Sequence, residues 1–388
     1  MYKKTFIKFI TVILSLCVLS SSSGCGNSLY SNFRELESLH VVETIGLDSK
    51  NHSLTLTVST GSLEDNSLSH LSGEGRTIMD SIQAVRNISP KEELYFSHVK
   101  YALLGKSILE DELSDFLSFV QRSTRLRMDT ALFTLLNCPA AEIISGGNEN
   151  FEITNALSSL ERTIKKRGDN YPFTAREVSM YLNEYGSALI CALNAFQGKD
   201  KEVRLVPEGF AIIKDFELIG YLNKTEALGA SILLNKIGEG PLTFNYEKDN
   251  TVSLLIEDSS REYKVNWGEN GEIKELDVKI NLSLGLGECT KPIDPKNKEV
   301  RKKLSNVVSQ HINEYCLSTL KRLLDDKADF LGLKGEIRRI YPNETAQLST
   351  NFINLLENAQ INVDSCVEIT SGYELKEPSQ HQEESKYE

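Results

Sequence analysis

The succession of apolar and polar positions along the chain predicts a mixture of strands and helices. Leu54, Leu56 and Val58 alternate with polar residues, which is the pattern of a strand with one buried face. Apolar residues at 78, 82 and 85 recur at helical spacing instead, so a helix is expected from about residue 76. Residues 60–75 are rich in Ser, Gly and Glu, and this composition predicts a loop.

The rest of the chain adds further elements without a regular β-α-β rhythm, so the predicted fold class is α+β. Local signals set some of their ends: Asn270-Gly271 predicts a hairpin turn, and Thr174 with Glu177 forms a helix-starting capping box. The other predicted strands are 41–47, 99–104, 128–135, 210–213, 218–222, 252–256, 263–267, 273–284 and 361–369. The other predicted helices are 109–120, one opened by Pro139, one ending at Gly168, one from Thr174, 226–234, 296–324 and 343–356.

The N-terminus has the pattern of a secretory signal peptide, predicted to span residues 1–24. Three lysines precede the apolar run 9–19, which is shorter than the roughly 20 residues that span a bilayer, and small residues then lead to Cys25. Gly24 and Ser23 fit a bacterial lipobox, whereas Ser22 stands where Leu is usual. Cys25 is therefore the predicted lipidation site, carrying diacylglycerol and an amino-terminal acyl chain such as palmitate. An ordinary signal peptide with a nearby cysteine is the alternative.

Charge and cysteine content exclude several classes of protein. The formal net charge is −12, and loss of the signal peptide with its three lysines brings it to −15. Such acidity disfavours nucleic acid as a partner and also disfavours broad adhesion to anionic lipid. The cysteines of the mature chain beyond Cys25 show no CxxC spacing and are interpreted as single buried residues that act as small apolar side chains; they are Cys138, Cys191, Cys289, Cys316 and Cys366.

No catalytic, cofactor-binding or metal-binding motif is found. Gly105-Lys106-Ser107 lacks the glycine that a phosphate-binding loop needs at position 100, where Lys100 stands. The sequence contains no HExxH and no GxSxG. Asp325, Asp326 and Asp329 match no EF-hand spacing and are interpreted as a solvated face, and His98 as a structural or partner-contacting residue.

Several segments, taken together, form a characteristic series along the chain. The longest is 208–234 (EGFAIIKDFELIGYLNKTEALGASILL). The others are Cys25, Arg34-Glu35-Leu36, Ile45-Gly46-Leu47-Asp48, 72–77, 96–105, 327–342 and 363–372. In content and order these segments resemble the Ger(x)C family, the C-subunit lipoproteins of spore germinant receptors. Gly26-Asn27, where the family often has Trp-Asp, and Leu331-Gly332-Leu333, where it tends to have Phe-Gly, depart from the pattern.

The resemblance implies three mixed α/β domains in an elongated arrangement, with mainly antiparallel sheets flanked by helices. It also implies a peripheral subunit on the outer surface of the spore's inner membrane, assembled with a multi-pass A-type subunit and a transporter-like B-type subunit. Only Cys25 carries over as a functional position, and no cofactor is implied.

The charged run 199–202 is the predicted boundary between two large regions. The expected divisions are a signal peptide (1–24), a lipidated tether (25–39), an N-terminal Ger(x)C region (40–200), a C-terminal Ger(x)C region (201–373) with a further division near residue 295, and a disordered tail (374–388). The predicted function is that of a membrane-anchored receptor subunit, not an enzyme. A solute-binding lipoprotein and a cell-wall enzyme are the alternatives, although the regular two-lobed rhythm of the first is missing.

Overall fold

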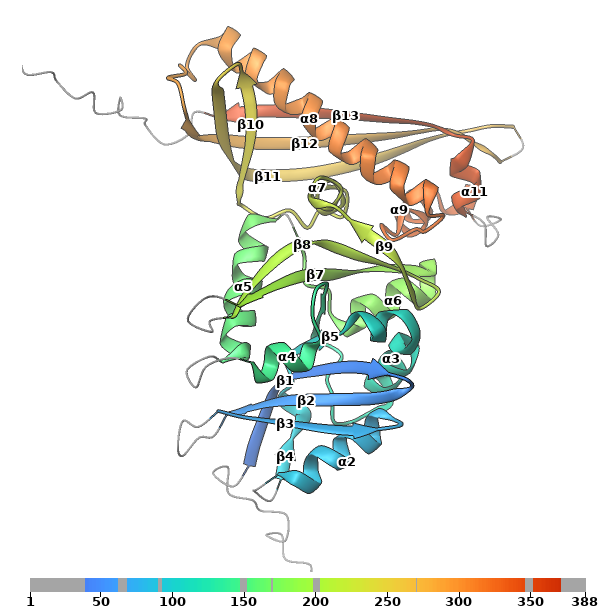
Figure 1. The fold of residues 1–388 in the computed structure, drawn as a ribbon. Helices are drawn as coiled ribbons and strands as arrows, with labels where there is room; N and C mark the ends of the chain where they lie inside the picture. Colours follow the sequence, from blue (N-terminus) through green and yellow to red (C-terminus); the bar gives the residue numbers. More distant parts are fainter. Residues whose placement is uncertain are drawn as a thin grey trace, which may run out of the picture.

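A computed structural model describes residues 39–61, 68–89, 93–146, 152–168, 170–197, 203–269, 271–345 and 352–370. Within these ranges the chain forms two sheets with helices packed on them (Figure 1). The predicted signal peptide, Cys25, the tether up to residue 38 and the predicted tail lie outside the described residues.

The first sheet is mixed and has nine strands in the order β3-β2-β1-β5-β6-β7-β8-β9, with β4 paired to β1. Pairs β1–β2, β2–β3, β7–β8 and β8–β9 are antiparallel, whereas β1–β5, β5–β6 and β6–β7 are parallel. Its strands are β1 (Leu39–Lys50), β2 (Ser53–Gly61), β3 (Leu68–Gly75), β4 (Glu93–Tyr95), β5 (Tyr101–Leu104), β6 (Ala131–Leu135), β7 (Ser187–Gln197), β8 (Val203–Lys214) and β9 (Glu217–Leu222).

Most of the helices between these strands are amphipathic and cover the first sheet. They are α2 (Ile78–Ile88), α3 (Leu113–Arg122), α4 (Ala140–Ser145), α5 (Ile153–Arg167) and α6 (Ala175–Tyr185), with a 3₁₀ turn at Phe96–His98 and a π-helical turn at Ile108–Glu112. The helix α7 (Lys224–Leu233) leads from β9 toward the second sheet.

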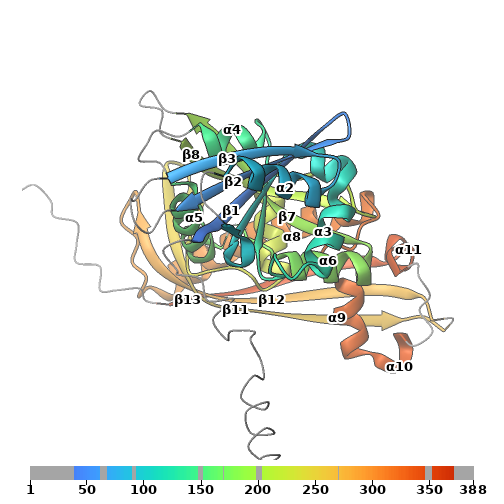
Figure 2. The same cartoon turned by 90° about the horizontal axis from the view of Figure 1, so that it is seen from below.

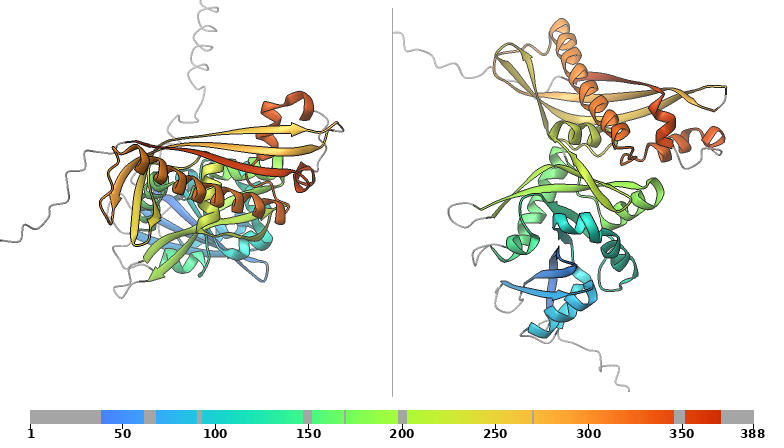
Figure 3. Two further views of the ribbon diagram at one scale, coloured as in Figure 1. Left: turned by 90° about the horizontal axis from the view of Figure 1, so that it is seen from above. Right: turned by 45° about the vertical axis from the view of Figure 1, so that its right-hand side comes forward.

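The second sheet has the order β10-β11-β12-β13, with β13 parallel to β12 and the other pairs antiparallel. The long helix α8 lies along it and packs on β13 and on α7 (Figure 3). The elements are β10 (Pro241–Glu247), β11 (Asn250–Trp267), β12 (Ile273–Cys289), α8 (Lys298–Asp325), α9 (Leu333–Ile340), α10 (Pro342–Thr345), α11 (Phe352–Glu357) and β13 (Gln360–Thr370).

The α+β class and the elongated arrangement are confirmed. Figure 1 shows the chain ascending from β1–β3 with α2, through the middle strands with α3–α6, to the second sheet with α8. The predicted face of α8 is also correct, because Leu304, Val308, Ile312, Thr319 and Leu323 are buried.

The prediction of a loop over residues 60–75 is wrong, because β3 occupies 68–75 and pairs with β2. α2 lies so close to this strand that its two glycines leave no room for a side chain. A Cβ at Gly73 would lie 2.6 Å from the backbone nitrogen of Val85, and a Cβ at Gly75 would lie 2.5 Å from the backbone nitrogen of Ser81. The glycines of this segment therefore reflect the close packing of a helix on a strand and not a loop.

Other boundaries also differ from the prediction. The two strands expected at 252–256 and 263–267 form one 18-residue strand, β11, because β12 pairs with it along nearly its whole length. The strands β4, β7 and β10 and the helix α9 were not predicted. The single helix expected at 343–356 is described as α10 and α11, with 346–351 outside the described residues.

The two predicted domain divisions do not coincide with a change of sheet. Residues 198–202 are outside the described residues, but β7 and β8 on either side pair with each other. Residue 295 lies between β12 and α8, both of which belong to the second sheet and its covering layer. The division into independently folding domains stays a prediction.

Candidate functional site

Cys25, the predicted functional residue, lies outside the described residues, so its side chain has no described geometry. The chain enters the fold at β1, beside β4 and near α2, at the end of the molecule opposite the second sheet (Figure 1). No helix among the described residues is long and apolar enough to cross a bilayer.

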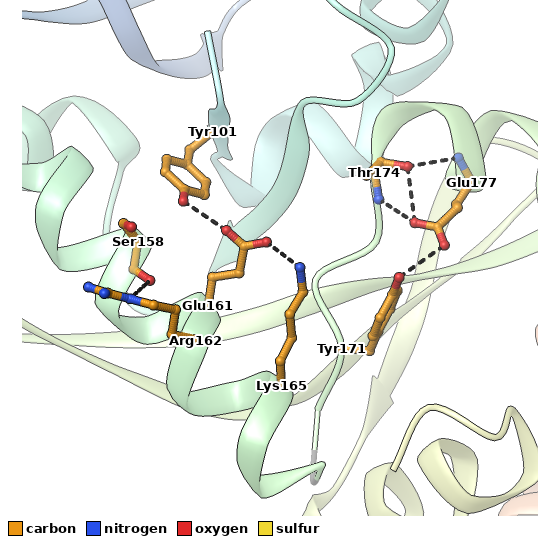
Figure 4. Close-up of polar contacts among 8 residues, drawn as sticks. All are labelled: Tyr101, Ser158, Glu161, Arg162, Lys165, Tyr171, Thr174 and Glu177. Atoms are coloured by element: carbon orange, nitrogen blue, oxygen red, sulfur yellow. Dashed lines mark hydrogen bonds and ion pairs between the residues drawn. The ribbon is translucent and has the colours of Figure 1, made fainter. Parts of the chain in front are cut away.

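A polar cluster between α5 and the first sheet places several titratable side chains around a cavity. Figure 4 shows Tyr101 on β5 pointing to Glu161 on α5. The Tyr101 hydroxyl donates to Glu161 Oε2 at 2.8 Å, and Lys165 Nζ lies 2.7 Å from Glu161 Oε1. The adjoining cavity of about 310 Å³ is also lined by His98 and Arg127.

The chemistry of this cluster is that of a structural brace. Burial, reinforced by the hydrogen bond to Glu161, raises the pKa of Tyr101 to about 12, so its hydroxyl stays protonated at neutral pH. Both oxygens of Glu161 already accept a donor, and Arg127 is paired with Asp129. Figure 4 also shows the predicted capping box at the start of α6. Thr174 Oγ1 accepts a hydrogen bond from the Glu177 backbone N–H at 3.2 Å, and Glu177 Oε2 accepts one from the Thr174 backbone N–H at 2.9 Å.

A second cavity joins two motifs that are far apart in the sequence. Lys106, Ser107 and Cys138 line a cavity of about 400 Å³ together with Asp48. Burial raises the pKa of the Cys138 thiol to about 11, so at neutral pH it is a protonated, weak nucleophile. Lys106 is paired with Glu110 at 3.2 Å. The arrangement therefore holds no activated nucleophile.

Two carboxylates, the half-buried Asp48 and the buried Asp329, hold helix starts. The oxygens of Asp48, at the end of β1, accept from the Ala140 and Ala141 N–H groups at 2.9 Å each. Those of Asp329 accept from Leu333 at 2.8 Å and Lys334 at 2.9 Å, at the start of α9. Each aspartate satisfies backbone donors that a helix start leaves without a partner.

The solvated acidic face expected at residues 325–329 is therefore only partly found. Asp326 pairs with Arg322 at 2.6 Å, whereas Asp329 is 4 % exposed and turns inward to cap α9. Among the described residues, no group of three or more His, Cys, Asp or Glu side chains is placed to hold a metal ion.

Comparisons with known proteins decide the family. The model described as "Spore germination protein N-terminal domain" matches residues 32–195, and "Spore germination B3/ GerAC like, C-terminal" matches 208–372. The chain belongs to the Ger(x)C family. A Ger(x)C relative, "Spore germination protein KC" of Bacillus subtilis (strain 168), is 23% identical over 375 residues, covering 86% of this chain and 88% of the relative. The solved structure of the GerBC protein aligns with a TM-score of 0.56 at 20% identity, over 84% of this chain and 96% of the other, which supports the shared fold.

The residues that carry the Ger(x)C resemblance mostly have structural roles. Gly209 has φ +118°, and a Cβ there would lie 2.2 Å from the Leu222 carbonyl oxygen. Asn223 and Glu226 form a second capping box at the start of α7. Together with Asp48 and Asp329, these residues show that the family-like segments fix strand ends and helix starts.

Asp329 yields a pH-dependent prediction for the Ger(x)C chain. Burial raises the pKa of its carboxyl to about 7, although backbone N–H groups of the α9 start oppose the shift. This pKa lies above that of an aspartate in the unfolded chain, which is near 4. The favourable contribution of the Asp329 carboxyl to stability is therefore complete below about pH 4 and is lost as the pH rises through about 7. The unfolding free energy of the parent minus that of Asp329→Asn should therefore decrease between pH 5 and pH 8.

Urea unfolding of both purified chains at several pH values checks this expectation. At low pH the variant should be less stable by about 1–3 kcal/mol, because the amide offers one acceptor where the carboxyl group offers two. A difference that stays constant or grows with pH would show that the buried carboxyl is already ionised at pH 5.

Proposed function

We propose that this Ger(x)C protein is a lipid-anchored subunit of a nutrient germinant receptor that is required for spore germination. In this proposal a lipid on Cys25 holds it at the outer surface of the spore inner membrane, where it assembles with A-type and B-type membrane subunits. The observation that carries the proposal is the match of both family models, in order, along residues 32–195 and 208–372.

The physical role of the anchor supports action by assembly. A lipid at Cys25 confines the chain to the bilayer surface and raises the effective concentration of membrane partners, so that weak interfaces suffice. The carboxylates that line two of the described cavities favour the same interpretation, because Glu161 and Asp48 are already occupied in bracing helices. Contact with partners accounts for the chain's function without a reaction at these positions.

A solute-binding lipoprotein is the alternative to be tested. A cavity of about 520 Å³ lies between β11 and α9, and there Arg261 and Arg339 already share Glu336 at 3.1 and 2.9 Å. We therefore expect calorimetry of the purified mature chain with amino acids, sugars and nucleosides to give no micromolar, stoichiometric signal. Such a signal, abolished by Arg339→Gln, would replace the subunit proposal with the solute-binding one.

A further inference from the structure

Three of the strands that end the two sheets are protected against pairing with another chain. The sheet orders place β3 and β9 at the ends of the first sheet and β10 and β13 at the ends of the second. The strand β10 begins with Pro241, which has no N–H to donate, and its register with β11 shifts near its end. The helix α8 contacts the backbone of the other two: Ser309 Oγ donates to the Ser365 carbonyl of β13 at 2.7 Å, and Arg322 Nη1 donates to the Tyr221 carbonyl of β9 at 3.3 Å. Proline, bulges and a covering helix are means by which edge strands avoid unwanted pairing.

The free side of β3 (Leu68–Gly75), called the β3 edge, has none of these features. The register of β3 with β2 shows no shift over its eight residues, and its sequence LSHLSGEG contains neither proline nor lysine. Among the described residues, β2 is the only partner found for the backbone hydrogen bonds of β3. The helix α2 packs on one face of the strand, at Gly73 and Gly75, and takes none of these bonds. The β3 edge is therefore long, regular and available for pairing.

The β3 edge lies at the end of the molecule where the chain enters the fold (Figure 1 and Figure 2). In β1, Val41 pairs with Gly61 of β2, which in turn pairs with Leu68 at the start of β3. Thirteen residues separate Cys25 from Leu39, where β1 begins, so even fully extended they reach at most about 50 Å. A lipid on Cys25 therefore keeps the β3 edge near the bilayer surface, where the loops of multi-pass proteins emerge.

We infer that the β3 edge accepts an extended segment of a multi-pass membrane subunit, which adds a strand to the first sheet. Strand addition gives the N–H and C=O groups of an edge their partners, and side chains at alternate positions of the added strand give specificity. The location of the edge at the anchored end of the molecule favours a membrane protein as the source of this strand. This inference rests on the proposed anchor at Cys25 and on the proposed assembly with membrane subunits.

Hydrogen exchange of the full mature chain, alone and in the complex purified from spore membranes, tests the inference without a substitution. Amides on the free side of β3 should exchange rapidly in the chain alone and become protected in the complex. Peptides from β9, β10 and β13 should exchange alike in both samples. A complex that forms with β3 still unprotected, or with protection gained at another edge instead, would overturn the inference.

Ser72→Lys/Glu74→Lys tests the same contact by protecting the β3 edge with charge. Both positions are exposed, so the thermal melt should stay close to that of the parent. Because lysine is disfavoured in strands, the two substitutions should lower the recovery of the membrane subunit roughly tenfold. The matched control is Thr243→Lys/Asn245→Lys, at exposed positions of the edge strand β10, which should recover as much membrane subunit as the parent. Equal recovery by all three chains, or equal loss in both variants, would contradict the inference.

Two other outcomes separate the possible occupants. A mature chain that sediments as a dimer, with β3 already protected, would show that a second copy occupies the edge and would overturn the inference. A parent chain that purifies without any multi-pass subunit would overturn the proposed function together with the inference, whereas a complex with an unprotected β3 overturns the inference alone.

Discussion

Ile213→Asp should unfold the first sheet. Ile213 lies in β8, pairs with Leu218 of β9 and is 0% exposed. Its neighbours Phe210, Ala211 and Ile212 are equally buried, so both faces of the strand are covered. Loss of a buried isoleucine side chain costs roughly 2–5 kcal/mol, and the unpaired carboxylate adds a further desolvation penalty. Since domains are stable by only about 5–15 kcal/mol, the native state should be lost or nearly so.

Thermal melts followed by circular dichroism measure this effect. Ile219→Asp is the matched control, because Ile219 lies in the adjacent strand β9 and is 41% exposed. We expect the control to melt close to the parent and Ile213→Asp to show no cooperative transition or a greatly lowered one. Coincident melts of the parent and Ile213→Asp would mean that β8 is not a central core strand.

Helices were easier to predict than strands, because their ends carry local signals. The capping box at Thr174 and the end of α5 at Gly168 are both found as expected. β7 escaped prediction because burial on both faces removes the alternation that marks a strand, as Leu189, Ile190 and Cys191 illustrate. In β10, by contrast, the alternation of Leu242 and Phe244 with polar residues is present, so this strand is predictable from the sequence.

The site was predictable only where its signal is local. The pattern around Cys25 is contiguous, so the sequence alone supports the anchor, which stays a prediction. The i,i+4 spacing of Glu161 and Lys165 predicts their ion pair, but Tyr101 lies 60 residues away and its contact needs the folded sheet. Asp329 appears in the sequence as part of an acidic run, and only the packing around α9 identifies it as a buried cap.

Cys25→Ala should abolish stable membrane attachment. Each buried methylene contributes about 0.8 kcal/mol, and stable anchoring takes two acyl chains or one chain with a second membrane signal. Without the Cys25 thiol, the diacylglycerol that anchors the chain cannot be attached. We expect unprocessed precursor or released protein, with no incorporation of a labelled fatty-acid analogue. Cys366→Ala is the matched control, because Cys366 is exposed on β13 and should leave labelling unchanged. Equal labelling of Cys25→Ala and the parent would exclude this site.

Co-purification from membranes of dormant spores is the most direct test of the proposed assembly. The tagged parent chain, extracted with mild detergent after brief crosslinking, should bring down multi-pass membrane subunits in fixed proportion. Cys25→Ala should lose them, and Cys366→Ala should retain them. A parent chain that is abundant in the spore membrane fraction but purifies without any multi-pass subunit would contradict the account.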